Sequence, residues 1–132
     1  MFKLILSLCI LLTLFSCDLP EGEGGNNTIR GHVFMKKYNS DFSRLIQEYY
    51  LADERVYIIY GDDTTTYHDD VRTNFDGSFE FRYLRSGKYT VFAYSRDSLS
   101  ITGLPKYAVK KSITLKDDDE KVLVEDIIVL DN

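Results

Sequence analysis

Apolar and polar residues alternate along most of the chain after Thr28. A repeat of two residues is typical of a β-strand that turns one face to a core and the other to water. The stretch "SFEFRYL" over 78–84 is the clearest case, and similar runs occupy 29–34, 55–61, 88–94, 110–116 and 121–130. The last run loses its phase at Glu125-Asp126, which predicts a β-bulge. We therefore predict an all-β sandwich of about seven short strands.

The dipeptide Asp76-Gly77 lies between two of these strand patterns. Glycine accepts the positive φ that tight hairpin turns require. A calcium loop would need further oxygen ligands at alternate positions, but the residues two and four places before Asp76 are Asn74 and Arg72. We therefore expect the corner of a β-hairpin at this point and no metal site.

One segment departs from the period of two. In "NSDFSRLIQEYYLADE", residues 39–54, apolar side chains recur at helical spacing, and Ser40 or Asp41 could cap the first turn. This pattern predicts a short amphipathic helix near residues 40–51. Its apolar side must pack on the sheet, and the side chains available for that contact are Phe42, Leu45, Tyr49 and Tyr50.

The N-terminal residues have the pattern of a secretory signal. Lys3 precedes an apolar run that is too short for the roughly 20 residues of a membrane-spanning helix. The run ends in "LFSC", which resembles the lipobox of bacterial lipoproteins, where cleavage before a cysteine leaves that cysteine to carry lipid. The alternative is an ordinary signal peptide with an incidental cysteine. We expect a signal peptide over 1–16, a lipidated Cys17 with a flexible tether over 17–27, and one domain over 28–132.

Charge and cysteine content narrow the possible functions. The chain has 16 Lys and Arg against 21 Asp and Glu, a formal net charge of −5, and no basic patch or basic pI argues for nucleic acid, which is therefore not an expected partner. Cys9 lies in the expected signal and Cys17 is the expected lipid site, which leaves no thiol for a disulfide or a nucleophile. No cofactor or metal is expected. We interpret the acidic clusters as solvated turns, and a cation site is the alternative. The clusters are Asp62-Asp63, Asp69-Asp70 and Asp117–Glu120.

The strand region resembles the carboxypeptidase regulatory-like domain, a transthyretin-like β-sandwich. The likeness rests on Gly31-His32-Val33, on "LADERVYI" over 51–58, and on the spacing of Thr73, Asp76-Gly77, Phe79, Phe81, Leu84, Gly87, Tyr89, Val91 and Ala93. It implies a Greek-key sandwich and a non-catalytic module, because such domains accompany peptidases, transporters and adhesins. Residues 35–50 depart from the family, in which the first two strands have a short connection.

A possible binding face is predicted on the outer side of the sheet. Tyr57 and Ile59 point away from the core-facing residues of their strand, and Phe92 and Tyr94 do the same in theirs. Side by side, they would form an aromatic face that suits a partner protein or a glycan, because tyrosine joins apolar area to a polar tip. The simpler interpretation is that the predicted helix covers these residues and forms a second small core with them.

These patterns favour a non-catalytic interaction or scaffold module of the Gram-negative cell envelope. Lipid on Cys17, with palmitate among its acyl chains, would hold it at the outer membrane, on the periplasmic or the outer side. The expected partner is another envelope protein or a glycan. The alternatives are a glycan-binding accessory protein that uses surface tyrosines, and a hydrolase with an unrecognised site. His32 and His68 are the only histidines and lie in unrelated segments, so no catalytic residue is predicted.

Replacing Cys17 with alanine should abolish the incorporation of radiolabelled palmitate, because no other cysteine follows the apolar run. The matched variant Cys9→Ala should still be labelled. Label that persists in Cys17→Ala would show that the lipid is attached elsewhere.

Overall fold

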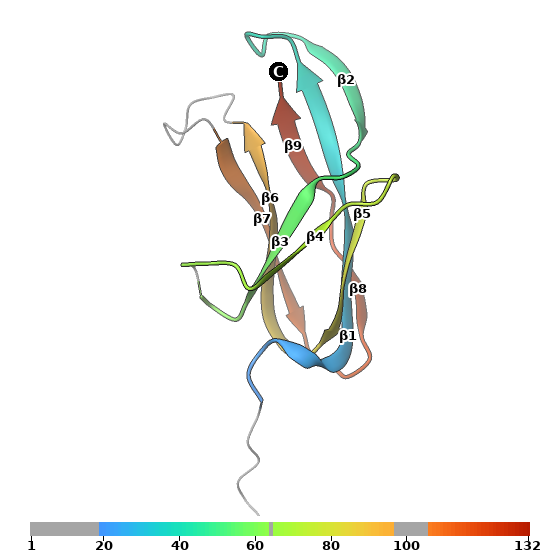
Figure 1. The fold of residues 1–132 in the computed structure, drawn as a ribbon, viewed down its shortest axis with the longest axis vertical. Helices are drawn as coiled ribbons and strands as arrows, with labels where there is room; N and C mark the ends of the chain where they lie inside the picture. The colour runs from blue at the N-terminus through green and yellow to red at the C-terminus, as the bar shows by residue number, and fades with distance from the viewer. Residues whose placement is uncertain (1–18, 64, 97–105) are drawn as a thin grey trace, which may run out of the picture.

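A computed structural model describes residues 19–63, 65–96 and 106–132, and the regular structure in these ranges is β-strand throughout (Figure 1). The all-β class predicted from the alternation is thus confirmed. Within these ranges no helix is long and apolar enough to cross a bilayer. The strands are β1 (Glu23–Tyr38), β2 (Leu45–Tyr50), β3 (Arg55–Tyr60), β4 (Asp69–Arg72), β5 (Ser78–Leu84), β6 (Gly87–Arg96), β7 (Lys106–Leu115), β8 (Lys121–Leu123) and β9 (Ile127–Asp131).

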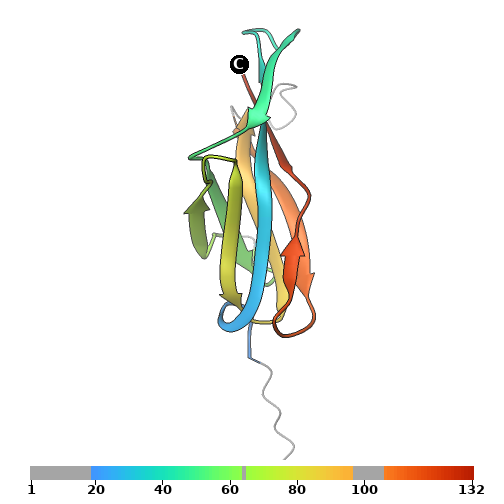
Figure 2. The same ribbon diagram turned by 90° about the vertical axis from the view of Figure 1, so that its right-hand side faces the viewer.

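The strands form two sheets around one apolar core (Figure 2). One sheet has four antiparallel strands in the order β4-β3-β6-β7. The other has five strands arranged around β1. Inner side chains of both sheets meet in the core, and the most deeply buried include Ile29, Val33, Phe79, Tyr89, Val91 and Ile127, each at most 2% exposed.

β1 is the longest strand and pairs along both of its edges. Its first half lies between β5 and β8, and its second half lies between β2 and β9. Gly31, in the first half, faces Phe79 of β5, and a Cβ at residue 31 would lie only 2.7 Å from the Phe79 ring. The absence of a side chain at residue 31 therefore makes room for the aromatic ring in the core.

The predicted irregularity near Glu125-Asp126 is present. β8 pairs with β1 as far as Arg30↔Leu123, and β9 resumes the pairing at Val33↔Ile127. Three residues, 124–126, therefore lie opposite two residues of β1, 31 and 32. One extra residue on one strand is the defining property of a bulge, so this prediction is confirmed.

Asp76-Gly77 forms a tight turn but not the corner of a hairpin. Gly77 has φ of 77°, and its N–H donates to the Asn74 carbonyl at 2.9 Å. Asp76 Oδ1 accepts hydrogen bonds from the N–H and the hydroxyl of Ser78, and these bonds lower the pKa of Asp76. β4 before the turn belongs to the four-stranded sheet, whereas β5 after it belongs to the other sheet. The prediction of paired strands was wrong because turn chemistry is local and does not specify which strands pair.

The helix predicted near 40–51 is wrong. Residues 45–50 form β2, which pairs antiparallel with the second half of β1. In the preceding turn, Asn39 Oδ1 accepts the Arg44 N–H at 2.9 Å and Asp41 Oδ1 accepts the Ser43 N–H at 3.0 Å. Side chains that bond nearby N–H groups compete with helical hydrogen bonds, and the edge of β1 supplies the alternative pairing.

β2 and the second half of β1 extend beyond the body of the molecule as an arm (Figures 1 and 2). The four side chains expected to contact the sheet through a helix, Phe42, Leu45, Tyr49 and Tyr50, lie on this arm. Tyr49 packs against the core, Phe42 contacts Tyr38, and Leu45 and Tyr50 are 40% and 48% exposed. The insert therefore adds a strand to the five-stranded sheet and does not cover the four-stranded one.

The chain before β1 is attached to the body. The Gly22 N–H donates to the Tyr89 hydroxyl at 2.9 Å, and the Gly22 carbonyl accepts the Arg85 N–H at 2.8 Å. The Tyr89 hydroxyl in turn donates to the Arg85 carbonyl at 2.8 Å. Burial raises the pKa of Tyr89, which keeps this hydroxyl protonated. Because β1 begins at Glu23, the folded domain begins before Thr28, inside the segment that we expected to be a tether.

Replacing Tyr89 with phenylalanine should lower the free energy of unfolding by about 1–3 kcal/mol, because it leaves buried backbone groups of Gly22 and Arg85 unpaired. Urea denaturation measures this change, and hydrogen exchange should show faster opening at Gly22. The matched variant Tyr83→Phe, at a side chain that is 66% exposed, should stay within about 0.5 kcal/mol of the unaltered chain. Equal stability of the two variants would contradict the role given to the Tyr89 hydroxyl.

Candidate functional site

The outer face of the four-stranded sheet, the face turned away from the core, carries the residues that the sequence analysis singled out. Strand register places Tyr57 beside Phe92, and Phe92 beside Lys110 of β7. Asp70 of β4 lies on the other side of Tyr57. A row of four side chains thus crosses the four strands, with aromatic rings at its centre and opposite charges at its ends.

Four aromatic residues gather on this face, and we call them the aromatic cluster: Tyr57, Tyr67, Phe92 and Tyr94. The rings of Tyr57 and Phe92 stack with their centroids 5.0 Å apart. Tyr94 meets both rings edge-on at 5.6 Å, and Tyr67 meets Tyr57 edge-on at 4.7 Å. Aromatic pairs favour these stacked and edge-on geometries. The structure thus brings together Tyr57, Phe92 and Tyr94 of the predicted face, and Ile59 follows Tyr57 on the same side of β3.

The members of this face differ in exposure. Phe92 and Ile59 are 6% and 5% exposed, whereas Tyr67 and Tyr94 are each 45% exposed. Phe92 and Ile59 therefore form the floor of the face. Tyr67 and Tyr94 present the aromatic surface that a ligand can reach.

Tyr67 comes from the loop between β3 and β4, and this loop covers the floor in place of the predicted helix. His68 fixes the end of the loop: its Nδ1 accepts the Tyr60 N–H at 3.0 Å, and its ring stacks on Tyr60 at 4.7 Å. Asp63 Oδ1 accepts the N–H and the hydroxyl of Thr65 at 2.9 and 2.7 Å, and these bonds lower the pKa of Asp63. The simpler interpretation of the outer face, burial under the insert, is therefore wrong.

Two adjoining hollows on this face share Ile59 and Lys110, and together we call them the outer groove. The larger, of about 320 Å³, is lined also by Thr65, Thr66, Tyr67, Phe92 and Tyr94. The smaller, of about 190 Å³, is lined also by Asp62, Asp63, Thr90 and Ser112. The outer groove thus combines aromatic rings, hydroxyl groups and a few charges in one shallow surface. This mixture can hold a ligand that has both an apolar face and many polar groups.

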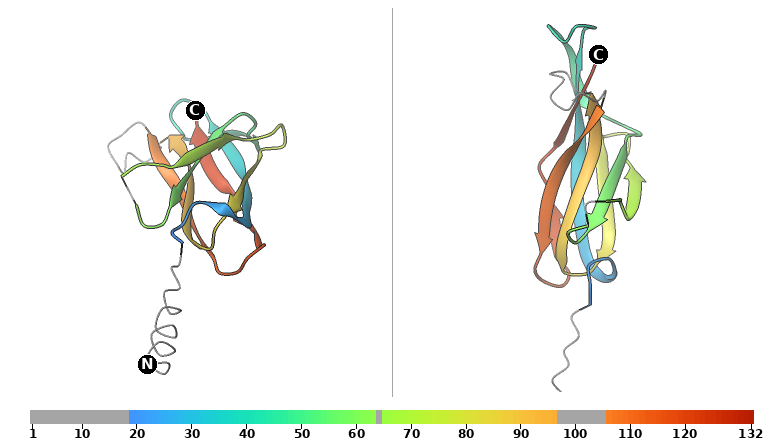
Figure 3. Two further views of the ribbon diagram at one scale, coloured as in Figure 1. Left: turned by 60° about the horizontal axis from the view of Figure 1, so that its bottom comes forward. Right: turned by 90° about the vertical axis from the view of Figure 1, so that its left-hand side faces the viewer.

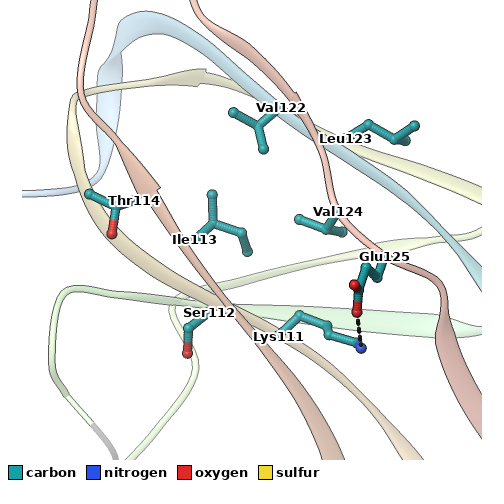
Figure 4. Close-up of a pocket in the computed structure, with 8 residues that line it drawn as sticks. All are labelled: Lys111, Ser112, Ile113, Thr114, Val122, Leu123, Val124 and Glu125. Carbon is teal, nitrogen blue, oxygen red and sulfur yellow. Dashed lines mark hydrogen bonds and ion pairs between the residues drawn. The ribbon is translucent and has the colours of Figure 1, made fainter.

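A separate hollow of about 350 Å³ lies between β7 and the segment 122–125, where the two sheets are not joined by strand pairing (Figure 4). Half of its lining is aliphatic, with Ile113, Val122, Leu123 and Val124, and the other half is polar or charged. The ion pair between Lys111 Nζ and Glu125 Oε2, at 3.2 Å, lies at one end of it. Without an aromatic side chain or a buried polar group in its lining, this hollow is better described as the open side of the core.

The largest of the hollows, of about 840 Å³, lies beside the segment that precedes β1. Leu19, Glu21 and Arg85 contribute to its lining, and Arg85 Nη1 donates to the Pro20 carbonyl at 3.1 Å. It is wide and open, and its lining contains no aromatic ring. Its shape follows from the way the N-terminal segment crosses the end of the sheets, so we do not consider it the site.

The titratable residues singled out by the sequence lie apart from one another. His32 Nδ1 is 3.9 Å from Asp126, on the five-stranded sheet, and His68 belongs to the loop beside the outer groove. Asp70 pairs with Arg55 at 3.3 Å, and Glu120 accepts backbone N–H groups of Lys116 and Asp117. Among the described residues, no three His, Cys, Asp or Glu side chains come close enough to hold a metal ion. Cys17, the expected lipid site, lies outside the described residues.

Sequence reasoning missed Tyr67 and Lys110. Tyr67 is a single aromatic residue in the polar run "TTTYHDD", and only the return of the loop over β3 places it on Tyr57. Nothing in the sequence distinguishes Lys110 from other surface lysines. Only the register with Phe92 places it at the centre of the outer groove. An isolated aromatic residue in a loop next to an aromatic strand was the only available signal.

No protein-family model matches this chain, and no curated protein matches it either. Among solved structures, a proposed carbohydrate binding protein from Pseudomonas aeruginosa superposes on it with a TM-score of 0.49 and 16% identity. The superposition covers 82% of this chain and 97% of the other. A similarity of this size does not assign the chain to a family.

Replacing Phe92 with alanine should destabilise the domain by about 3 kcal/mol or more, because it removes a buried ring from the floor of the outer face. Tyr94→Ala should cost clearly less, about 1–2 kcal/mol, because this ring is half exposed and loses mainly edge-on contacts. Urea denaturation of the two variants measures the difference. A larger loss for Tyr94 than for Phe92 would contradict the division into floor and accessible surface.

Proposed function

We propose that this chain is a non-catalytic, lipid-anchored binding module of the bacterial cell envelope, and that its outer groove holds a glycan. The observation that carries the proposal is the outer groove itself, in which Tyr67 and Tyr94 stand beside the hydroxyl groups of Thr65 and Thr66. The finer fold assignment, a transthyretin-like regulatory domain, and the lipid on Cys17 are parts of the same proposal.

The chemistry of a glycan fits this groove. One side of a sugar ring presents C–H groups, which pack on an aromatic ring, while its hydroxyl groups need hydrogen-bond partners around the rim. Tyr67 and Tyr94 offer the aromatic contact, and Lys110 offers a charged donor. The hydroxyl groups of Thr65 and Thr66 donate to Asp63 and to the Tyr67 carbonyl, so they offer acceptor oxygens to a ligand. The cluster is held by its own ring contacts, so the aromatic surface is in place before a ligand arrives.

The shape of the groove favours binding over catalysis. It is shallow, and the one histidine beside it uses Nδ1 to accept a backbone hydrogen bond and places Nε2 3.8 Å from Asp63. In this arrangement the histidine orders a loop and is not aimed at a hydroxyl nucleophile. The hydrolase alternative therefore has less support than either binding alternative.

The experiment is a binding screen of the full-length chain, purified in detergent, on a panel of immobilised neutral and acidic polysaccharides. At least one polysaccharide should bind. Tyr94→Ala and Tyr67→Ala should each weaken that binding roughly tenfold or more, which corresponds to about 1.4 kcal/mol of lost contact.

The control is Tyr83→Ala, which removes a tyrosine that is 66% exposed from β5 of the other sheet and should bind normally. Urea denaturation should confirm that all three variants are folded. If no polysaccharide of the panel binds, or if the Tyr67 and Tyr94 variants bind as well as the Tyr83 variant, the outer groove is not a glycan site.

A further inference from the structure

The outer positions of β6 and β7 carry four basic residues and no acidic one, although the whole chain has a net charge of −5. These residues are Lys88, Arg96, Lys106 and Lys110. The alternation of the two strands turns Tyr89, Val91 and Ala93 into the core and leaves the even-numbered positions outside. We call this set the basic stripe.

The basic stripe follows the direction of the strands past the outer groove. Cross-strand register pairs Arg96 with Lys106, Phe92 with Lys110, and Lys88 with Thr114. Successive pairs are four residues apart, which is about 13 Å at the usual rise of a strand. The cations are therefore spaced along a line, with Lys110 in the middle and inside the groove.

Two of the four charges are partly compensated by a particular acidic residue. Arg96 pairs with Asp131 at 3.1 Å. Lys106 lies near Glu54, where its charge opposes the rise in the Glu54 pKa that burial causes. None of the ion pairs found among the described residues involves Lys88 or Lys110. Of the described residues that line the larger, aromatic hollow, Lys110 alone is charged.

We propose that the ligand of the outer groove is an acidic polysaccharide, one whose sugars carry carboxylate groups, and that it lies along β6 and β7. This inference rests on the proposed glycan function and adds the charge and direction of the ligand. A carboxylate on the bound sugar pairs with Lys110 while its ring packs on Tyr94 or Tyr67. The positive charge of the basic stripe attracts further carboxylates along the polysaccharide.

The surroundings of Lys110 direct the acidic group to one side. Asp62 and Asp63 line the smaller hollow and repel a carboxylate from the end of the groove near the β3–β4 loop. Lys110 and Ser112 line this hollow as well, whereas the outer positions of β7 on the other side of Lys110 are Ala108 of the larger hollow and Lys106. A carboxylate on Lys110 is thus favoured on the side of Lys106 and disfavoured on the side of Asp62 and Asp63.

The test compares two polymers on the full-length chain in detergent: polygalacturonate, which is acidic, and dextran, which is neutral. Polygalacturonate should bind at least about tenfold more tightly at low salt, and the difference should shrink as salt screens the charges. Lys110→Gln should weaken polygalacturonate binding roughly fivefold to tenfold and dextran binding clearly less, because glutamine still donates a hydrogen bond but carries no charge. Lys88→Gln should have a smaller effect in the same direction.

Lys121→Gln is the matched control, because it removes one exposed lysine from β8 of the other sheet and should change neither affinity. Equal binding of dextran and polygalacturonate, or an unaltered affinity in Lys110→Gln, overturns the acidic ligand and leaves the glycan function standing. If polyglutamate or anionic lipid vesicles bind as tightly as polygalacturonate, and Tyr94→Ala has no effect on any of them, charge alone explains the binding and the polysaccharide assignment is wrong. If neither polymer binds but another neutral polysaccharide of the panel does, the inference alone is wrong; if no polysaccharide of the panel binds, the proposed function is wrong as well.

Discussion

The pairing of β1 along both edges is the constraint on which the rest of the structure depends. One strand of 16 residues holds β5 and β8 beside its first half and β2 and β9 beside its second half. The inserted residues after β1 therefore have a backbone edge to pair with, and they become β2 of the arm. As a result, the insert stays on the five-stranded sheet, and the outer face of the four-stranded sheet is left to the short loop between β3 and β4.

That loop makes the outer groove a formed site. A sheet face without cover would expose Phe92 and Ile59, and a face under a helix would be closed. The loop, held by the contacts between His68 and Tyr60, places Tyr67 over the floor and leaves Tyr94 and Lys110 accessible. The alternation that builds the core also builds the groove, because the odd positions of β6 and β7 face inward and the even positions carry the aromatic rings and lysines.

The sequence predicted those features of the structure that depend on a few neighbouring residues. The strands, the turn at Asp76-Gly77 and the bulge before β9 depend on alternation and turn chemistry within a few residues. The helix near 40–51 was wrong because Asn39 and Asp41 bond the turn while β1 supplies a pairing edge, and neither effect is visible in the spacing of apolar residues. Tyr57, Phe92 and Tyr94 were grouped correctly because strand parity alone puts them on one face. Tyr67 and Lys110 needed tertiary register, which no single stretch of sequence contains.

The arrangement of the ends gives the basic stripe a direction relative to the proposed anchor. The residues before β1 and the arm lie at opposite ends of the long axis, and β6 and β7 run between these ends (Figures 1 and 3). The attachment of Gly22 to Tyr89 holds the start of the described chain at one end of the sheets, and the anchor proposed at Cys17 comes shortly before it in the sequence. A polysaccharide that follows the stripe would then run from the anchored end toward the arm, outward from the membrane surface. Lysines spaced along the strands, with one aromatic contact midway, suit a polymer held in this direction better than a small sugar bound at a single point.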